Sequence, residues 1–358
     1  MRSRFAFLLM IAALALPLRP ALACTTFCFQ DGGTLVFGRN YDWTIGDGLA
    51  IVNKSGVNKT AMVDVGAATW TSKYGSLTFN QYGREFPTGG MNERGLVVEL
   101  MWLDVAGYPG TDGRGVLPTL QWIQYQLDNA ATVDQVIGSD RSVRISSSAP
   151  AKIHFLVADA QGNVASVEFI LGVMVVHRGD HMPYPVLAND TYDASVEYAK
   201  KVGRRTGKSP VASLDRFARA ASYQPNASTP AAAVKNAFAL LDDVAQGDHT
   251  QWSIVYDVRA RRVYFKTHAS PGTRWIDFSA LSFTCDTPVK VLDINAALFG
   301  DVGSKFGPYK YETNHQLVET AFTKTPFLSK VTADTRDQLA RYPESTTCAV
   351  SKSRGSGK

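Results

Sequence analysis

Residues 21–43 read ALACTTFCFQDGGTLVFGRNYDW, and this stretch decides how the rest of the chain is interpreted. The small residues Ala21 and Ala23 fit the cleavage site of a secretory signal peptide, which would be cut after Ala23. Cutting there would leave Cys24 as a new N-terminus that carries both a thiol and a free α-amino group. We therefore predict that Cys24 is a nucleophile with a base on the same residue.

The two groups have compatible acidities. A cysteine thiol of pKa about 8.5 is only a few per cent ionised near neutrality. An α-amine of pKa about 7.7 to 8.0 is partly neutral there and can take the thiol proton. Residues 25–30 and 34–37 predict two strands around a turn at residues 31–33. Such a hairpin would bring Arg39 beside Cys24 to favour the thiolate, and Asp42 to orient the amine.

The pattern of an N-terminal Cys24, a hairpin and then Gly-Arg-Asn-Tyr-Asp-Trp at residues 38–43 resembles the choloylglycine hydrolase family of N-terminal nucleophile hydrolases. That family includes bile salt hydrolases and penicillin V acylases. The resemblance implies an α+β fold, a four-layer αββα sandwich of two antiparallel sheets. The residue pattern alone indicates mixed α and β structure, with strand runs flanked by helix pairs.

Further site residues come from the same resemblance. Asn189, after a short apolar run, is similar to the family asparagine that donates its amide to the oxyanion, although this chain lacks the usual proline. Arg216 matches the family's active-site arginine. Trp102 stands where bile salt hydrolases have an asparagine and some penicillin V acylases a tyrosine, so a backbone N–H there is expected to serve the oxyanion. Trp43 and Trp102 are expected to wall the substrate pocket.

Each of these residues also has a plainer interpretation. An asparagine is common in turns, one arginine on a helix is often solvated, and Trp102 could be core packing. A cysteine after a signal sequence can also be the acylated residue of a bacterial lipoprotein, which would make the chain a lipid-anchored binding protein. The order Ala21-Leu22-Ala23 suits ordinary signal peptidase better, which favours the enzyme.

Composition supports an exported protein of one domain. Residues 1–23 form the predicted signal peptide, residues 24–350 a single domain and residues 351–358 a disordered tail. Removing the signal's three arginines changes the net charge from +5 to +5 − 3 = +2, which is too small to imply nucleic acid as a partner. The cleavable signal peptide predicts a periplasmic or secreted location, and no other segment is apolar enough to span a membrane.

The remaining cysteines and histidines are assigned structural roles. Cys285 and Cys348 could form a disulfide in an exported chain, or both could stay reduced and buried. Cys28 is expected to be a buried free thiol. His154 is interpreted as structural, and His177 and His181 lack acidic or thiol neighbours at metal-binding spacing, so no metal and no cofactor are assigned.

The expected secondary structure completes the picture. Helices are predicted at residues 118–129, after Thr132, from Ser213 and after Thr229. Residues 104–115 are predicted to form a loop over the rim of the site. Strands are predicted at residues 76–80, 95–103, 153–159, 163–171, 173–177, 252–258, 262–267 and 289–293.

These observations lead to one functional expectation. The chain should be an exported amidase that hydrolyses a linear carbon–nitrogen amide through Cys24. Two tryptophans near the nucleophile favour an aromatic or long apolar acyl group, as in penicillin V acylases, with N-acyl homoserine lactones as further substrates. Conjugated bile salts are the alternative substrate class. The partner is a small-molecule amide, and the sequence leaves a homo-oligomer open.

Overall fold

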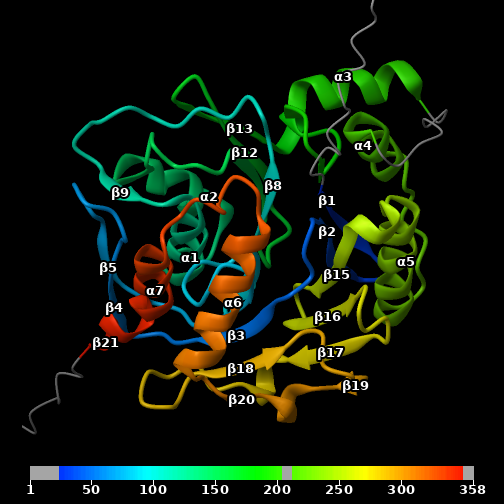
Figure 1. Cartoon of the computed structure of the whole chain (residues 1–358). Helices are drawn as coiled ribbons and strands as arrows, with labels where there is room; N and C mark the ends of the chain where they lie inside the picture. Colours follow the sequence, from blue (N-terminus) through cyan, green and yellow to red (C-terminus); the bar gives the residue numbers. More distant parts are fainter. Residues whose placement is uncertain (1–23, 204–211, 350–358) are drawn as a thin grey trace, which may run out of the picture.

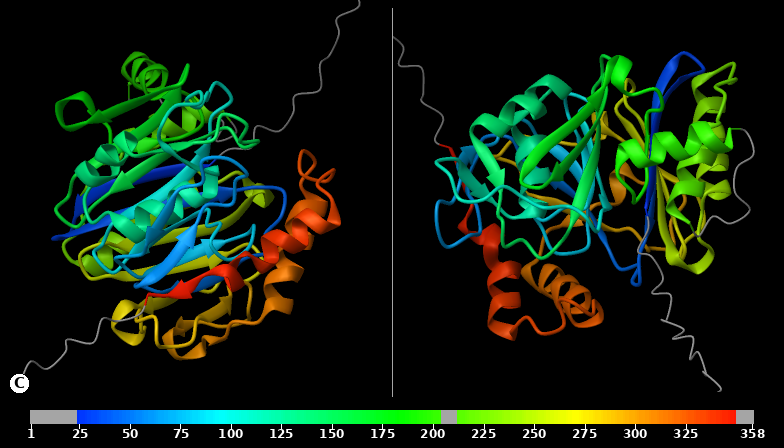
Figure 2. Two further views of the ribbon diagram at one scale, coloured as in Figure 1. Left: turned by 90° about the vertical axis from the view of Figure 1, so that its left-hand side faces the viewer. Right: turned by 90° about the horizontal axis from the view of Figure 1, so that it is seen from above.

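The computed structural model describes residues 24–203 and 212–349. The predicted signal peptide and the predicted tail at residues 351–358 therefore lie outside the described residues. Two large sheets stack face to face, and helices cover their outer surfaces (Figure 2). The α+β fold with large antiparallel sheets confirms the predicted fold class.

The first sheet has seven strands and contains the β1–β2 hairpin. All of its pairings are antiparallel except that of β17 with β19. In spatial order the strands are β14 (Val186–Leu187), β1 (Thr25–Asp31), β2 (Thr34–Asp42), β15 (Thr250–Asp257), β16 (Arg262–Thr267), β17 (Arg274–Asp277) and β19 (Gly300–Asp301).

The second sheet has nine antiparallel strands. Their order is β13 (Val173–Arg178), β12 (Val164–Ile170), β11 (Ile153–Ala158), β8 (Val97–Trp102), β7 (Gly89–Asn92), β6 (Ser76–Asn80), β3 (Leu49–Asn53), β18 (Lys290–Asp293) and β20 (Gly307–Pro308). Two small sheets join β21 (Thr347–Cys348), β4 (Val57–Thr60) and β5 (Thr69–Thr71), and β10 (Val143–Ile145) with β9 (Gly115–Leu117).

Helices close the sandwich on both sides (Figure 2). On the second sheet lie α1 (Thr119–Asn129) and α2 (Val133–Gly138), and on the first lie α4 (Ser213–Ala221) and α5 (Pro230–Asp243). Helix α3 (Tyr192–Val202) packs against α4. Alternation along β11 separates the two cores: Leu156 faces the first sheet, whereas Phe155 stacks on Trp122 of α1. The four layers are therefore helix, sheet, sheet and helix, as expected.

The β1–β2 hairpin forms as the sequence predicts. Gly32 and Gly33 both have positive φ, of 55° and 81°, which the two central residues of a tight hairpin turn require. The register pairs Thr25 with Asn40 and Asp31 with Thr34. The second strand runs to Asp42 rather than ending near residue 37, so it carries Arg39 and Asp42 back to the start of β1.

The remaining differences from the predicted elements are local. Most predicted strands and helices are present within two residues of the expected bounds, β8 in place of residues 95–103 among them. The elements that the sequence analysis missed include β3, β4, α3, several short strands and two C-terminal helices, α6 (Tyr311–Lys324) and α7 (Ala333–Arg341). These two helices pack against each other as a hairpin in front of the second sheet (Figure 1).

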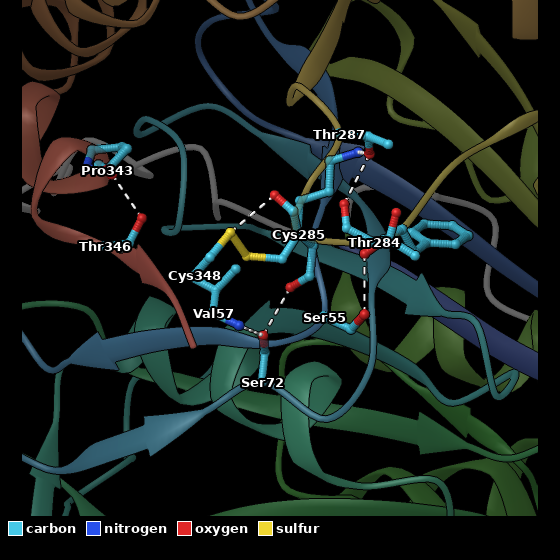
Figure 3. Close-up of a disulfide and its surroundings, with 11 residues drawn as sticks. Ser55, Val57, Ser72, Thr284, Cys285, Thr287, Pro343, Thr346 and Cys348 are labelled. Carbon is cyan, nitrogen blue, oxygen red and sulfur yellow. Dashed lines mark hydrogen bonds between the residues drawn. A yellow bond between two sulfur atoms is a disulfide. The ribbon is translucent and has the colours of Figure 1, made fainter. Parts of the chain in front are cut away.

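A disulfide between Cys285 and Cys348 holds the chain just after this C-terminal hairpin (Figure 3). Next to it, Cys348 pairs with Val57 of β4, and the backbone N–H of Ser55 donates to Phe283 at 2.8 Å. The disulfide therefore closes a separation of 63 residues, and Cys28 is a buried free thiol, as predicted.

The disulfide gives a stability prediction. Replacing Cys285 and Cys348 together by alanine should lower the free energy of unfolding by about 4 kcal/mol, because the unfolded chain regains the entropy that the cross-link removes. Urea unfolding under oxidising conditions measures the loss. With a reductant present, parent and variant should unfold at the same urea concentration. Equal stability under oxidising conditions would contradict the prediction.

Candidate active site

Cys24 lies immediately before β1 and is 3% exposed. The β1–β2 register places it beside Tyr41, and both residues line a cavity of about 310 Å³. The thiol therefore lies in the wall of this cavity, just before the start of β1.

Alternation along β2 sends its side chains to two different layers. Arg39 points between the sheets and forms an ion pair with Glu99 of β8. Asn40 points the other way and donates from Nδ2 to the Leu241 carbonyl of α5 at 2.7 Å. Asp42 shares the side of Asn40. Cys24 therefore has an arginine on one side of the strand and a carboxylate on the other.

The Arg39–Glu99 ion pair is fully buried. Tyr256 of β15 donates its hydroxyl to Glu99 at 2.5 Å, and Arg39 also donates to the Thr88 carbonyl at 3.3 Å. Burial raises the pKa of Glu99 to about 7, although the charge of Arg39 opposes this. Burial lowers the pKa of Arg39, but Glu99 and, to smaller extents, Cys24 and two tyrosines together outweigh it, so the net shift is upward. Arg39 therefore stays charged beside Cys24.

The thiol itself is held in its protonated form. Burial raises the pKa of Cys24, and the charge of Asp42 raises it further. The Arg39 charge and the backbone N–H of Asp42 lower it, but they do not reverse the shift. A base is therefore needed to make the thiolate at neutral pH.

Asp42 is held by two side chains that the sequence analysis did not identify. Thr250 donates its hydroxyl to Oδ1 at 2.5 Å, and Gln246 donates Nε2–H to Oδ2 at 2.8 Å. Burial raises the pKa of Asp42 to about 6, while these hydrogen bonds and the charges of Arg216 and Arg39 lower it. With these partners in place the carboxylate is therefore ionised mainly above about pH 6, and without them it would ionise only at higher pH.

Arg216 of α4 connects Asn189 to the start of β1. Its Nε–H donates to the Thr25 hydroxyl at 3.0 Å, and NH2 donates to Oδ1 of Asn189 at 2.8 Å. Because Oδ1 accepts from an arginine, the Asn189 amide nitrogen must point the other way. It donates to the Trp102 carbonyl at 2.9 Å and has a second hydrogen for another acceptor.

The cavity beside Cys24 is walled by aromatic rings. The Trp102 ring lies 6.3 Å from Trp43 and 5.6 Å from Phe327, centroid to centroid. Phe322 of α6 and Leu339 of α7 belong to the opposite wall. None of the described residues that line this cavity carries a charge. The space therefore suits an apolar group.

All seven site residues predicted from the sequence come together here. Cys24, Trp43 and Trp102 line the cavity, Arg39 and Asp42 act on the pKa of Cys24, and Arg216 and Asn189 are bonded to each other. The indole N–H of Trp102 donates to Asp104 at 2.6 Å, so it is engaged away from any oxyanion.

Comparison with known proteins now identifies the family. The sequence model for linear amide C–N hydrolases of the choloylglycine hydrolase family matches residues 24–203, just over half of the chain. The chain belongs to this family. It is therefore a hydrolase of carbon–nitrogen bonds in linear amides.

Two relatives are penicillin V acylases. The one from Pectobacterium atrosepticum is 27% identical over 327 residues, covering 77% of this chain and 86% of the relative. The solved structure of the one from Agrobacterium tumefaciens is also 27% identical and has a TM-score of 0.71, covering 80% of this chain and 98% of that chain.

A bile acid hydrolase shares the fold. The structure of a variant of the conjugated bile acid hydrolase from Clostridium perfringens has a TM-score of 0.62 at 17% identity, covering 77% of this chain and 98% of that chain. At this identity the likeness concerns the fold alone.

The sequence analysis of this choloylglycine hydrolase family member did not identify the residues that contact Arg39 and Asp42, namely Glu99, Gln246 and Thr250. Glu99, as the one charged residue in the apolar strand VVELMW, was a usable indication of a buried partner. Gln246 and Thr250 carried no such indication. The predicted rim loop at residues 104–115 was wrong: none of its residues lines the cavity, and the loop between α6 and α7 supplies Phe327 instead.

Residues 24–203 and 212–349 contain no group of three or more side chains that could hold a metal ion. Within the same ranges, no helix has the length and apolar character needed to cross a bilayer.

The hydrogen bond from Thr250 to Asp42 gives a pH prediction. Hydrogen bonds to a carboxylate favour its ionised form, so Thr250→Val should raise the pKa of Asp42. The acid limb of kcat/KM should then move to higher pH, because the role predicted for Asp42, orienting the α-amine, requires its ionised form. Thr71→Val, on β5, is the control. An unchanged acid limb in Thr250→Val would mean that Asp42 does not determine it.

Proposed function

We propose that this hydrolase is an exported cysteine amidase of the penicillin V acylase type, with Cys24 as nucleophile. Its preferred substrates are linear amides whose acyl group is aromatic or a long apolar chain, including phenoxyacetyl amides and N-acyl homoserine lactones. One observation carries the proposal: Cys24 lies in the wall of a cavity of about 310 Å³ whose described lining is uncharged and largely aromatic or aliphatic.

The base in this proposal is the α-amino group of Cys24. Burial keeps the thiol protonated at neutral pH, so proton removal must accompany attack. The described cavity lining contains no histidine or carboxylate that could act as the base. Asp42, at the end of the neighbouring strand, holds the amine, and Arg39 stabilises the negative charge on sulfur.

Acylation then proceeds in two steps. Cys24 Sγ forms a bond to the acyl carbon while the thiol proton passes to the α-amine. The carbonyl oxygen becomes an oxyanion, which Asn189 Nδ2 and a backbone N–H near Trp102 stabilise. When the carbon–nitrogen bond breaks, the ammonium returns the proton to the leaving amine. The product is a thioester of Cys24.

Deacylation uses the same groups. A water molecule gives a proton to the α-amine and attacks the thioester carbon. The carbon–sulfur bond breaks, the acid leaves, and Cys24 regains its proton. Arg216 contributes by fixing the orientation of Asn189 through its 2.8 Å hydrogen bond.

Export belongs to the same proposal, because the self-base mechanism requires a free α-amine. Removal of residues 1–23 by signal peptidase would expose it and direct the protein to the periplasm or the medium. The disulfide between Cys285 and Cys348 supports an oxidising location.

The first test concerns the nucleophile. Cys24→Ser, with processing intact, should lose most activity, because an alcohol is poorly activated by an amine of pKa about 8. Turnover of a phenoxyacetyl amide measures the loss. Cys28→Ser, at the other cysteine that forms no disulfide, is the control and should retain activity if it folds. A Cys24→Ser enzyme as fast as the parent would show that the thiolate is not the nucleophile.

The second test concerns the α-amine. A variant that retains one uncleaved alanine before Cys24 should be inactive, because the nitrogen of Cys24 is then an amide without a basic lone pair. Intact mass confirms the N-terminus of each preparation. The exported parent should lack residues 1–23 only, and added diacylglycerol would identify a lipoprotein. Full turnover by the extended variant would exclude the self-base mechanism.

The third test concerns the acyl group. An aromatic acyl group can stack on Trp102, and such a pair contributes about 0.5 to 1.5 kcal/mol beyond area burial. Trp102→Ala should therefore lower kcat/KM for phenoxyacetyl amides about 2- to 10-fold more than for acetyl amides. Trp275→Ala, which lies outside the cavity, is the control.

The same assay compares substrate classes. Phenoxyacetyl and fatty-acyl amides should exceed glycocholate in kcat/KM, because steroid hydroxyls would find few partners on an apolar wall. Equal losses for acetyl and aromatic substrates in Trp102→Ala would make Trp102 a packing residue. A marked preference for glycocholate would assign the enzyme to the bile salt hydrolases.

A further inference from the structure

A buried histidine–glutamate pair lies behind the segment that carries Asn189. The β11–β12 register pairs Phe155 with Val167, which places His154 directly opposite Glu168 on the same face of the sheet. His154 is fully buried and Glu168 is 2% exposed. Nδ1 of His154 lies 3.0 Å from Oε1 of Glu168.

The pair binds both ends of residues 188–192. His154 Nε2 lies 2.8 Å from the Ala188 carbonyl oxygen. At the other end, the backbone N–H of Tyr192 donates to the two Glu168 oxygens at 3.0 and 3.2 Å. Asn189 lies between these two anchors, one residue after Ala188. The backbone that carries Asn189 is therefore held from the second sheet as well as by α4.

Both ring nitrogens of His154 take part in hydrogen bonds, which limits where its protons can lie. Both ring nitrogens of His154 face acceptors, a carboxylate and a carbonyl, but a neutral imidazole has only one N–H. Nε2–H donates to the Ala188 carbonyl, and a second proton lies between Nδ1 and the Glu168 carboxyl group. Tyr192 is the first residue of α3, and a helix N-terminus favours a negative charge there. His177 Nδ1 also faces Glu168, at 3.9 Å.

We propose that His154 is a positioning residue for Asn189. By holding the Ala188 carbonyl while Glu168 holds Tyr192, it fixes the segment so that Asn189 Nδ2 points at the reacting carbonyl. This inference rests on the oxyanion role proposed for Asn189. A misplacement of about 1 Å can cost about 100-fold in rate, so a residue that touches no substrate can still control kcat.

A double-mutant cycle tests the inference. His154→Phe should lower kcat about 10- to 100-fold in the parent and leave KM nearly unchanged. In an Asn189→Ala background the same substitution should change kcat little, because the group it positions is gone. Equal fold reductions in both backgrounds would make His154 a general structural residue and overturn the inference. No reduction in the parent would also overturn it.

The cycle separates this inference from the proposed function. If Asn189→Ala alone keeps full kcat, the oxyanion role of Asn189 fails and the inference fails with it. If Asn189→Ala loses activity but the two reductions by His154→Phe are equal, only the inference fails. Circular dichroism checks that each variant folds. Should His154→Phe not fold, His154→Gln takes its place in the cycle with the same criteria.

Glu168→Gln provides the matched control, because its amide has the same shape. Its oxygen can accept from Tyr192 and its NH₂ can donate to Nδ1 of a neutral His154, which still donates Nε2–H to Ala188. We expect kcat within about threefold of the parent, since a hydrogen bond is worth only about 1 kcal/mol. A loss of kcat as large as that of His154→Phe would overturn the inference that the hydrogen bonds of His154 and Glu168 position Asn189.

Discussion

The buried charge of Arg39 is the constraint on which the rest of the structure depends. An uncompensated ion between two sheets would be very unfavourable, and breaking a buried ion pair costs about 3 to 5 kcal/mol. Glu99 therefore has to lie opposite on the second sheet, with the Tyr256 hydroxyl donating to it. Any Cβ at Gly89 would overlap the Glu99 carboxylate, so the neighbouring strand needs a glycine there. One charge beside Cys24 thus determines residues on three other strands.

The two sheets divide the work around Cys24. The first sheet supplies Cys24, Arg39 and Asp42 from a single hairpin and the residue before it, where local sequence determines their spacing. The second sheet supplies Glu99 and Trp102 from β8. Glu99 pairs with Arg39 across the interface between the sheets, and Trp102 forms part of the cavity wall. Asn189 belongs to neither sheet; it follows the edge strand β14 and is bonded to Trp102 and Arg216. The site can form only when the sandwich closes.

What could be predicted from the sequence follows this division. The hairpin was predictable because its turn, alternation and motif are all local, and the family resemblance added Asn189 and Arg216. Gln246 and Thr250 were missed because they reach Asp42 from about 200 residues away through strand pairing, which one sequence does not reveal. The C-terminal helices were missed although Leu317, Val318, Ala321 and Phe322 recur at helical spacing, so there the pattern was overlooked rather than absent. The rim was assigned to the wrong loop because glycine-rich composition does not say where a loop lies.

The C-terminal hairpin of α6 and α7 lies far along the sequence from most of the residues around Cys24. All the candidate site residues except Arg216 lie in the part matched by the family, whereas Phe322, Phe327 and Leu339 lie more than 100 residues beyond its end. Substitutions in the hairpin can therefore reshape this wall of the cavity while the residues around Cys24 stay unchanged. In this chain, the size of the cavity and the groups beside the thiol can thus be altered independently of each other.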